Sequence, residues 1–113
     1  MHCILVGGLG FIGRNIIEEL RLNHSYKIHV IDDLSNASAA SLDYKDVKVL
    51  QEKYLSKLCP DYLEKLTGSR VFYFLAGETR VAESRERPLD FIRANVVEPS
   101  EFVVRNVRNG DRF

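Results

Sequence analysis

Hydrophobic and polar positions divide this chain into short apolar runs and longer amphipathic stretches. The apolar runs, at residues 3–6, 27–32, 47–50 and 71–75, are rich in β-branched and aromatic side chains and predict strands. The amphipathic stretches, at residues 11–23, 60–68 and from about 84 to 109, have the apolar spacing of helices. Strands that alternate with helices predict parallel pairing through right-handed crossovers.

Each predicted helix carries its apolar side chains in a recognisable pattern. The apolar face of the first helix should lie on the sheet, and it consists of Ile12, Ile16, Ile17 and Leu20. The last helix has apolar positions at Leu89, Ile92, Val96, Phe102, Val103 and Val107. Pro99 lacks a backbone N–H and should kink or divide this helix. Residues 33–41 are rich in Ser, Asn and Ala and predict a loop that leads into a short helix or an irregular segment.

A glycine-rich stretch, Gly7-Gly8-Leu9-Gly10-Phe11-Ile12-Gly13, joins the first strand to the first helix. Gly7 allows a tight turn, Gly10 lets backbone N–H groups approach a pyrophosphate, and Gly13 lets the helix pack closely on the strand. The phosphates would lie at the positive end of the helix. With a strand before it and a helix after it, the stretch predicts a dinucleotide site. The alternative is a glycine-rich turn without a ligand.

Asp32 ends the second strand, at about the twenty-residue distance that the dinucleotide motif requires of its acidic residue. Its carboxylate would accept hydrogen bonds from the ribose hydroxyls of NAD and would repel the 2′-phosphate of NADP. We therefore predict NAD as the cofactor. The alternative role of Asp32 is to cap the turn that follows the strand.

The order of elements predicts an α/β protein with a partial Rossmann (doubly wound) fold and a parallel sheet in the strand order 3-2-1-4. The ends of the first and fourth strands then meet where a ligand binds, and Leu75-Ala76-Gly77 leaves little side chain there. We expect a single truncated NAD(P)-binding domain over residues 1–113, without a substrate domain. Asp111-Arg112-Phe113 stands where a fifth strand would begin, so the fourth strand should be an unprotected edge that favours self-association.

Composition excludes several functional classes. The 113 residues include 16 basic and 16 acidic ones, a balance that indicates neither nucleic-acid nor membrane binding. No apolar run reaches membrane-spanning length and the amino terminus lacks the features of a secretory signal, so we expect a cytoplasmic protein. Cys3 and Cys59 lie far apart, and His2, His24 and His29 lack metal-ligand spacing. We interpret the cysteines as reduced and structural, and we predict no metal site.

Together these features resemble the NAD-dependent sugar-nucleotide epimerase/dehydratase family of the extended short-chain dehydrogenases/reductases. Gly7, Gly10 and Gly13 match the GxxGxxG motif of the family. Residues 31–36 are similar to the ribose-binding segment of UDP-glucose 4-epimerases. The fourth strand and the following helix match at Leu75-Ala76-Gly77, Glu83-Ser84, Pro88-Leu89 and Asn95-Val96.

The resemblance implies a set of NAD-binding residues. By this likeness, the residues lining the pyrophosphate would be Gly7, Gly10, Phe11 and Ile12, with Gly13 completing the motif. The adenosine ribose would be held by Asp32 and Asn36, and the nicotinamide half would face Leu75, Ala76, Gly77 and Asn95. The resemblance also implies a nucleotide-sugar substrate for a longer parent protein, and a homodimer formed through the fourth helix.

The chain departs from the usual family pattern in three places. After the third strand, the family has an aspartate that reaches the adenine edge and then an aliphatic residue, where this chain has Lys53 and Tyr54. A lysine cannot accept the hydrogen bond of the adenine amino group. Glu98-Pro99 replaces a Gly-Thr pair, and Val6 replaces a threonine.

The catalytic groups that the resemblance implies fall beyond the fourth helix, past the end of this chain. They are a tyrosine and lysine spaced YxxxK, and a Ser or Thr that orients the substrate. Tyr44 and Lys48 have that spacing but precede the third strand, whereas the family motif follows the fifth. We therefore interpret the chain as the NAD-binding N-terminal part of a sugar-nucleotide epimerase or dehydratase, inactive by itself. The alternatives are a free-standing nucleotide-binding or interaction module, and a complete enzyme that uses Tyr44 and Lys48.

Overall fold

Parallel strands form the central sheet of the computed structural model, which describes residues 1–37 and 44–113. The strands are β1 (His2–Val6), β2 (Lys27–Ile31), β3 (Val47–Leu50) and β4 (Arg70–Phe74), in the order β3-β2-β1-β4. Val6 of β1 lies opposite Ile31 on one side and Phe74 on the other. The α/β class, the partial doubly wound fold and the strand order are confirmed. The part of the 33–41 segment beyond residue 37 lies outside the described residues.

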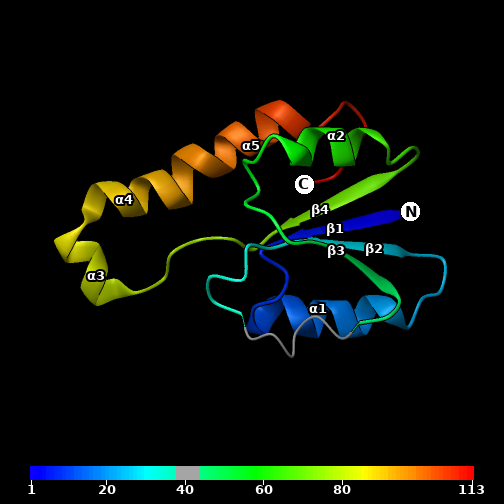
Figure 1. Ribbon diagram of the computed structural model, residues 1–113, viewed down its shortest axis with the longest axis horizontal. Coiled ribbons are helices and arrows are strands. Elements are labelled where there is room, and N and C mark those ends of the chain that lie inside the picture. Colours follow the sequence, from blue (N-terminus) through cyan, green and yellow to red (C-terminus); the bar gives the residue numbers. More distant parts are fainter. Residues whose placement is uncertain (38–43) are drawn as a thin grey trace.

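Helices cover both faces of this sheet (Figure 1). On one face lies α1 (Phe11–Arg21), and on the other lie α2 (Leu58–Glu64) and α5 (Glu98–Asn106). Consecutive side chains of β1 therefore enter different cores: Ile4 packs in the cluster that contains Phe102 of α5, and Leu5 in the cluster that contains Ile17 of α1. Because both faces of β1 are covered, its sequence is apolar from Cys3 to Val6.

The helical region after β4 is divided at Arg87, whose φ of −132° and ψ of 59° are not helical, whereas at Pro99 the helix continues and only its hydrogen-bond pattern changes. It consists of α3 (Val81–Glu86), α4 (Pro88–Ile92), the π-helical turn η2 (Arg93–Val97) and α5. Pro99 lies in the first turn of α5 and has no N–H to donate to the carbonyl four residues earlier. The helical hydrogen-bond pattern changes to a π turn just before it.

One apolar position of α1 was expected to be buried and is not. Ile12 is 63% exposed, whereas Ile17 and Gly13 are buried. At 100° per residue, Ile12 lies about 140° from Ile17 around the helix axis, and Gly13 lies only about 40° away. Gly13 therefore occupies the face that packs on the sheet, and the prediction for Ile12 is wrong.

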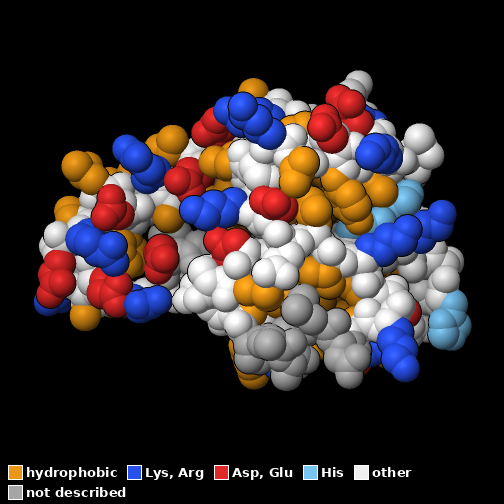
Figure 2. Space-filling model, viewed as in Figure 1, with side chains coloured by type: hydrophobic (Ala, Val, Ile, Leu, Met, Phe, Trp, Pro, Cys, Tyr) orange, Lys and Arg blue, Asp and Glu red, His pale blue; other side chains and the backbone are white. Residues whose placement is uncertain are grey.

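Part of the last helical region also lies away from the core. Leu89, Ile92 and Val96 are 77%, 52% and 58% exposed, because α3 and α4 extend beyond the sheet (Figure 1). Acidic and basic side chains are interspersed along this extension (Figure 2). Of the apolar positions expected there, Phe102 is fully buried in α5. None of the helices in the described ranges has the length and apolarity that crossing a bilayer requires.

The chain end pairs with the free edge of β4. Arg112 forms a parallel bridge with Val71: the N–H of Phe72 donates to the Arg112 carbonyl at 2.8 Å, and the Arg112 N–H donates to the Arg70 carbonyl at 3.1 Å. A single parallel bridge, and not a strand, therefore stands where the fifth strand was expected to begin. The expectation that the β4 edge is unprotected is wrong for the half of β4 that Arg112 covers.

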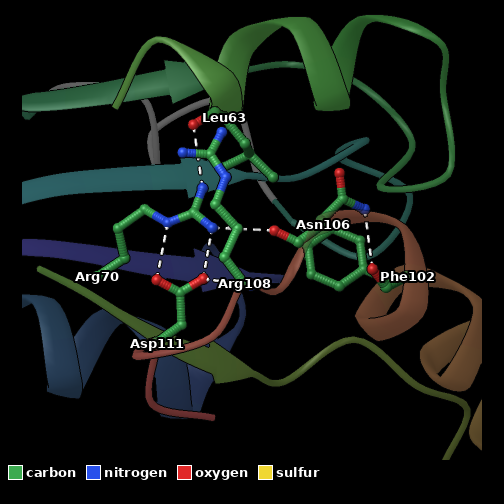
Figure 3. A network of polar contacts seen from close by, with 6 residues as sticks. All are labelled: Leu63, Arg70, Phe102, Asn106, Arg108 and Asp111. Carbon is green, nitrogen blue, oxygen red and sulfur yellow. Dashed lines mark hydrogen bonds and ion pairs between the residues drawn. The ribbon is translucent and has the colours of Figure 1, made fainter. Parts of the chain in front are cut away.

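Arg70 anchors this chain end from inside the fold (Figure 3). Its side chain is 1% exposed, and its guanidinium pairs with both carboxylate oxygens of Asp111. It also donates to the carbonyls of Leu63 at 3.1 Å and Asn106 at 3.0 Å. The Arg70 guanidinium holds the pKa of Asp111 below its usual value. The buried cation is thus both paired and hydrogen-bonded, as burial of a charge requires.

Candidate functional site

The carboxyl ends of the strands open into one cleft of about 270 Å³. Residues that follow each strand line it: Gly7 after β1, Asp32 after β2, Lys53 after β3 and Ala76 after β4. Ligands of open parallel α/β sheets bind at this edge, where the strand order reverses. The cleft is therefore the candidate binding site of this fold.

The glycine loop at the centre of the cleft has the shape that the sequence predicts. Gly7 has a φ of +74°, and a Cβ there would lie 2.7 Å from the backbone nitrogen of Ala76. A Cβ on Gly13 would lie 2.2 Å from the carbonyl oxygen of Gly8. Because neither side chain exists, β1 can turn beside the end of β4 and α1 can begin directly against the loop.

The N-terminus of α1 offers this cleft an anion-binding position. Gly10 lines the cleft and is the N-cap of α1, and no side chain caps the helix. The first N–H groups of a helix lack intrahelical partners and carry partial positive charge. A Cβ on Gly10 would have no atom closer than 3.9 Å, so the space in front of these N–H groups is open. The glycine loop and the N-terminus of α1 together fit a pyrophosphate.

Phe11 and Ile12 do not contribute side chains to the cleft. They are 86% and 63% exposed and do not line it. Gly13 does not line it either, and its role is the close packing against Gly8. Phe11 and Ile12 can therefore take part in pyrophosphate binding only through their backbone N–H groups.

Asp32 connects the glycine loop to the end of β2. Its Oδ2 accepts the N–H of Leu9 and its Oδ1 accepts the N–H of Leu34, both at 2.9 Å. The second bond is the turn-capping role that the sequence left open as an alternative, and it holds Leu34 at a φ of +63°, which is uncommon for a residue other than glycine. Because each carboxylate oxygen accepts more than one hydrogen bond, Asp32 can hold the loop and still bind a ribose hydroxyl.

Negative charge dominates the cleft. The acidic residues that line it are Asp32, Asp33, Glu52, Glu78 and Glu98. Lys53 is the one cation among the described residues that do so. Burial opposes ionisation of Asp33, but hydrogen bonds from Ser35 and the charge of Lys53 lower its pKa overall. Such a cleft disfavours an additional phosphate group near Asp32.

The segment after β4 forms the other end of the cleft. The predicted residues Leu75, Ala76 and Gly77 line it, as does Asn36 from the segment after β2. Asn95, predicted to face the nicotinamide half, does not line the cleft. Its Nδ2 donates to the Glu78 carbonyl at 2.9 Å and its Oδ1 accepts the Glu78 N–H at 2.8 Å. Asn95 thus holds the segment in place from η2.

A contact between Tyr54 and Glu98 lies at the cleft and was not foreseen from the sequence. The Tyr54 hydroxyl donates to Glu98 Oε2 at 3.0 Å, and both residues line the cleft. Burial, and then the neighbouring Glu98 carboxylate, raise the pKa of Tyr54, so the hydroxyl stays protonated. Two separate departures from the family pattern are therefore one structural feature. No local signal could pair them, because they are 44 residues apart.

The pair with YxxxK spacing is split between the two faces of the sheet. Tyr44 packs in the α1-side cluster, with the Arg21 guanidinium carbon 5.3 Å from its ring centre. Val47 and Val49 also face that side, so Lys48 between them faces the opposite side, where it lines a second hollow with His29. Tyr44 and Lys48 therefore cannot act on one substrate atom.

His29 belongs to a row of hydrogen-bonded polar side chains at the end of the sheet opposite the cleft. It is 2% exposed, and its ring nitrogens contact the Tyr62 hydroxyl at 2.7 Å and His2 Nδ1 at 2.9 Å. Burial, followed by the charges of His2 and the nearby lysines, lowers the pKa of His29 to about 4.

Residues 1–37 and 44–113 contain no group of three His, Cys, Asp or Glu side chains arranged to hold a metal ion.

Comparison with known proteins identifies relatives along nearly the whole chain. The sequence model described as "NAD dependent epimerase/dehydratase family" matches residues 3–103. UDP-glucose 4-epimerase of Bacillus subtilis is 35% identical in an alignment of 104 residues, which covers 85% of this chain and 30% of that protein. The chain spans 15–30% of the length of the curated relatives it matches.

Solved structures share the fold. Pal from Bacillus thuringiensis superposes with a TM-score of 0.79 at 21% identity, over 94% of this chain and 36% of that one. UDP-glucose 4-epimerase from Thermus thermophilus, solved as a complex with NAD, superposes with a TM-score of 0.74 at 22% identity, over 92% of this chain and 33% of that one.

Proposed function

Since this chain belongs to the NAD dependent epimerase/dehydratase family, we propose that it binds NAD in the cleft at the carboxyl ends of its strands. The observation that carries the proposal is the bond from the Leu9 N–H to Asp32 Oδ2 at 2.9 Å. It brings a carboxylate suited to a ribose next to the uncapped N-terminus of α1, which is suited to a pyrophosphate. Adjacent ribose and phosphate positions are what a dinucleotide requires.

Most of the predicted residues then bind the dinucleotide, while Gly13 and Asn95 support the segments that do so. The backbone N–H groups at the start of α1 bind the pyrophosphate across Gly10, and Asp32 and Asn36 hold the adenosine ribose. Residues 75–77 leave room beside Gly7 for the nicotinamide half, and Asn95 keeps that segment in position. NAD itself supplies the hydride chemistry when bound. This chain supplies binding and orientation.

Thermal unfolding with added dinucleotide tests the proposal. A ligand that binds the folded state at about 100 times its dissociation constant stabilises it by about 2.7 kcal/mol. NAD is therefore expected to raise the melting temperature in a concentration-dependent way. NADP is expected to raise it less, because the acidic cleft repels the 2′-phosphate. An unchanged melting temperature at millimolar NAD, or equal effects of the two dinucleotides, would count against the proposal.

We further propose that nucleotide-sugar chemistry belongs to a longer protein and that this chain is inactive alone. The split of Tyr44 from Lys48 supports this, because it leaves no tyrosine and lysine with YxxxK spacing at the cleft among the described residues. Tyr54 does line the cleft, but its hydroxyl is bound to Glu98. Incubation with NAD and UDP-glucose or UDP-galactose should give no interconversion, in a sample whose NAD binding shows that it is folded. Turnover in that sample would refute the proposal.

A further inference from the structure

We propose that Lys53 contacts the nucleobase of the bound dinucleotide, so that this cleft does not select for the amino group of adenine. The inference rests on the proposed function, NAD binding in this cleft. It makes Lys53 a residue that determines base specificity.

The topology places the base near Lys53. The pyrophosphate position lies beside β1 and the ribose position at Asp32 lies after β2, so the adenosine half extends toward β3, the outermost strand. The Asp32 N–H donates to the Leu50 carbonyl at 3.1 Å, which fixes the end of β3 beside Asp32. Glu52 and Lys53 follow that end directly and line the cleft.

The backbone of Lys53 is fixed while its side chain is exposed. Its carbonyl accepts the N–H of Ser56 at 2.8 Å and the thiol of Cys59 at 3.4 Å. The side chain lies on the cleft side of this turn, where its charge helps to lower the pKa of Asp33. The ammonium group can therefore reach the ribose and base positions from a fixed backbone, and replacement of this exposed side chain should not disturb the fold.

The chemistry of an ammonium group sets the specificity. It has three N–H donors and no acceptor, so it can donate to the ring nitrogens of adenine but cannot accept a bond from the adenine amino group. Hypoxanthine has a carbonyl oxygen at that position, and an ammonium can donate to it. A cleft that reads the base through Lys53 should therefore accept either base.

Calorimetric binding of NAD and of nicotinamide hypoxanthine dinucleotide tests this inference. The wild-type chain should bind the two within about threefold of each other, or favour the hypoxanthine form. Lys53→Asp supplies a charged acceptor and should favour NAD by about tenfold or more. Lys57→Asp makes the same charge change on the next lysine along the chain, outside the residues that line the cleft, and should keep the wild-type ratio.

The outcomes separate this inference from the function on which it rests. A wild-type preference of about tenfold for NAD, as expected if Glu52 bound the amino group, would overturn the inference and leave NAD binding intact. An unchanged ratio in Lys53→Asp would do the same. If circular dichroism shows that Lys53→Asp is unfolded, Lys53→Asn, an uncharged acceptor, must shift the ratio toward NAD, and no shift overturns the inference. Failure of the wild type to bind either dinucleotide overturns the proposed function itself.

Discussion

Replacing Asp111 with alanine is expected to lower the free energy of unfolding by about 3–5 kcal/mol. The Arg70 side chain is 1% exposed, and Asp111 is the carboxylate with which it pairs. In the variant, Arg70 keeps its bonds to the carbonyls of Leu63 and Asn106 but becomes a buried cation without a counter-charge. A domain of this size has a total stability of about 5–15 kcal/mol, so the loss would bring the variant close to unfolding.

Urea denaturation followed by circular dichroism measures this loss. Glu101→Ala is the control: it removes an ion pair with Arg105 whose side chains are 41% and 52% exposed, and it should cost less than about 1 kcal/mol. Because the pKa of Asp111 is lowered in the fold, its contribution is complete above the unfolded carboxyl pKa of about 3.9 and is lost as the pH falls through the lower folded value. A loss no larger in Asp111→Ala than in the control would refute the reasoning.

Three further predictions concern packing, pH and the cleft wall. Gly13→Ala should lower the free energy of unfolding, measured by thermal unfolding, by about 1–3 kcal/mol, because its Cβ would lie 2.2 Å from the carbonyl oxygen of Gly8. Glu19→Ala, on the exposed side of α1, should change that free energy little. Wild-type stability should fall as the pH drops from 6.5 toward 4, because His29 has a pKa of about 4 when folded against 6.5 when unfolded, and the unfolded chain therefore takes up the proton first. His29→Gln should flatten that part of the urea-measured profile, and an unaltered profile would argue against a buried neutral imidazole. Tyr54→Phe should lower the free energy of unfolding by about 0.5–1.5 kcal/mol in the wild type but not in a Glu98→Ala background, and equal losses in both would show that the hydroxyl bond contributes nothing.

Local sequence patterns predicted the part of the fold that positions the cleft. The alternation of apolar runs with amphipathic stretches gives the parallel order β3-β2-β1-β4, because right-handed crossovers leave few other arrangements. The roles of Gly7 and Gly13 were also predictable from the sequence, because each packs so closely against backbone that no other residue fits. Asp32 is more complex, since it caps a turn and holds the glycine loop at once.

Local sequence patterns could not predict which distant residues pair or which apolar side chains stay exposed. Arg70 and Asp111 are 41 residues apart, and each taken alone has the appearance of a surface charge. Amphipathic spacing shows which side chains of a helix are apolar but not whether anything covers them, and Leu89, one of the apolar positions of the last helix, is 77% exposed. The bond from Tyr54 to Glu98 likewise depends on how α5 lies over the sheet.

Calorimetric titration of NAD into the wild type, Asp32→Ala and Asp33→Ala tests the central claim most directly. Asp33 is a matched control, because it is the adjacent carboxylate in the cleft and also accepts the N–H two residues ahead. We predict saturable binding of one NAD per wild-type chain, weakened about tenfold or more by Asp32→Ala and much less by Asp33→Ala. The absence of heat with millimolar NAD, or equal binding by Asp32→Ala and the wild type, would contradict it.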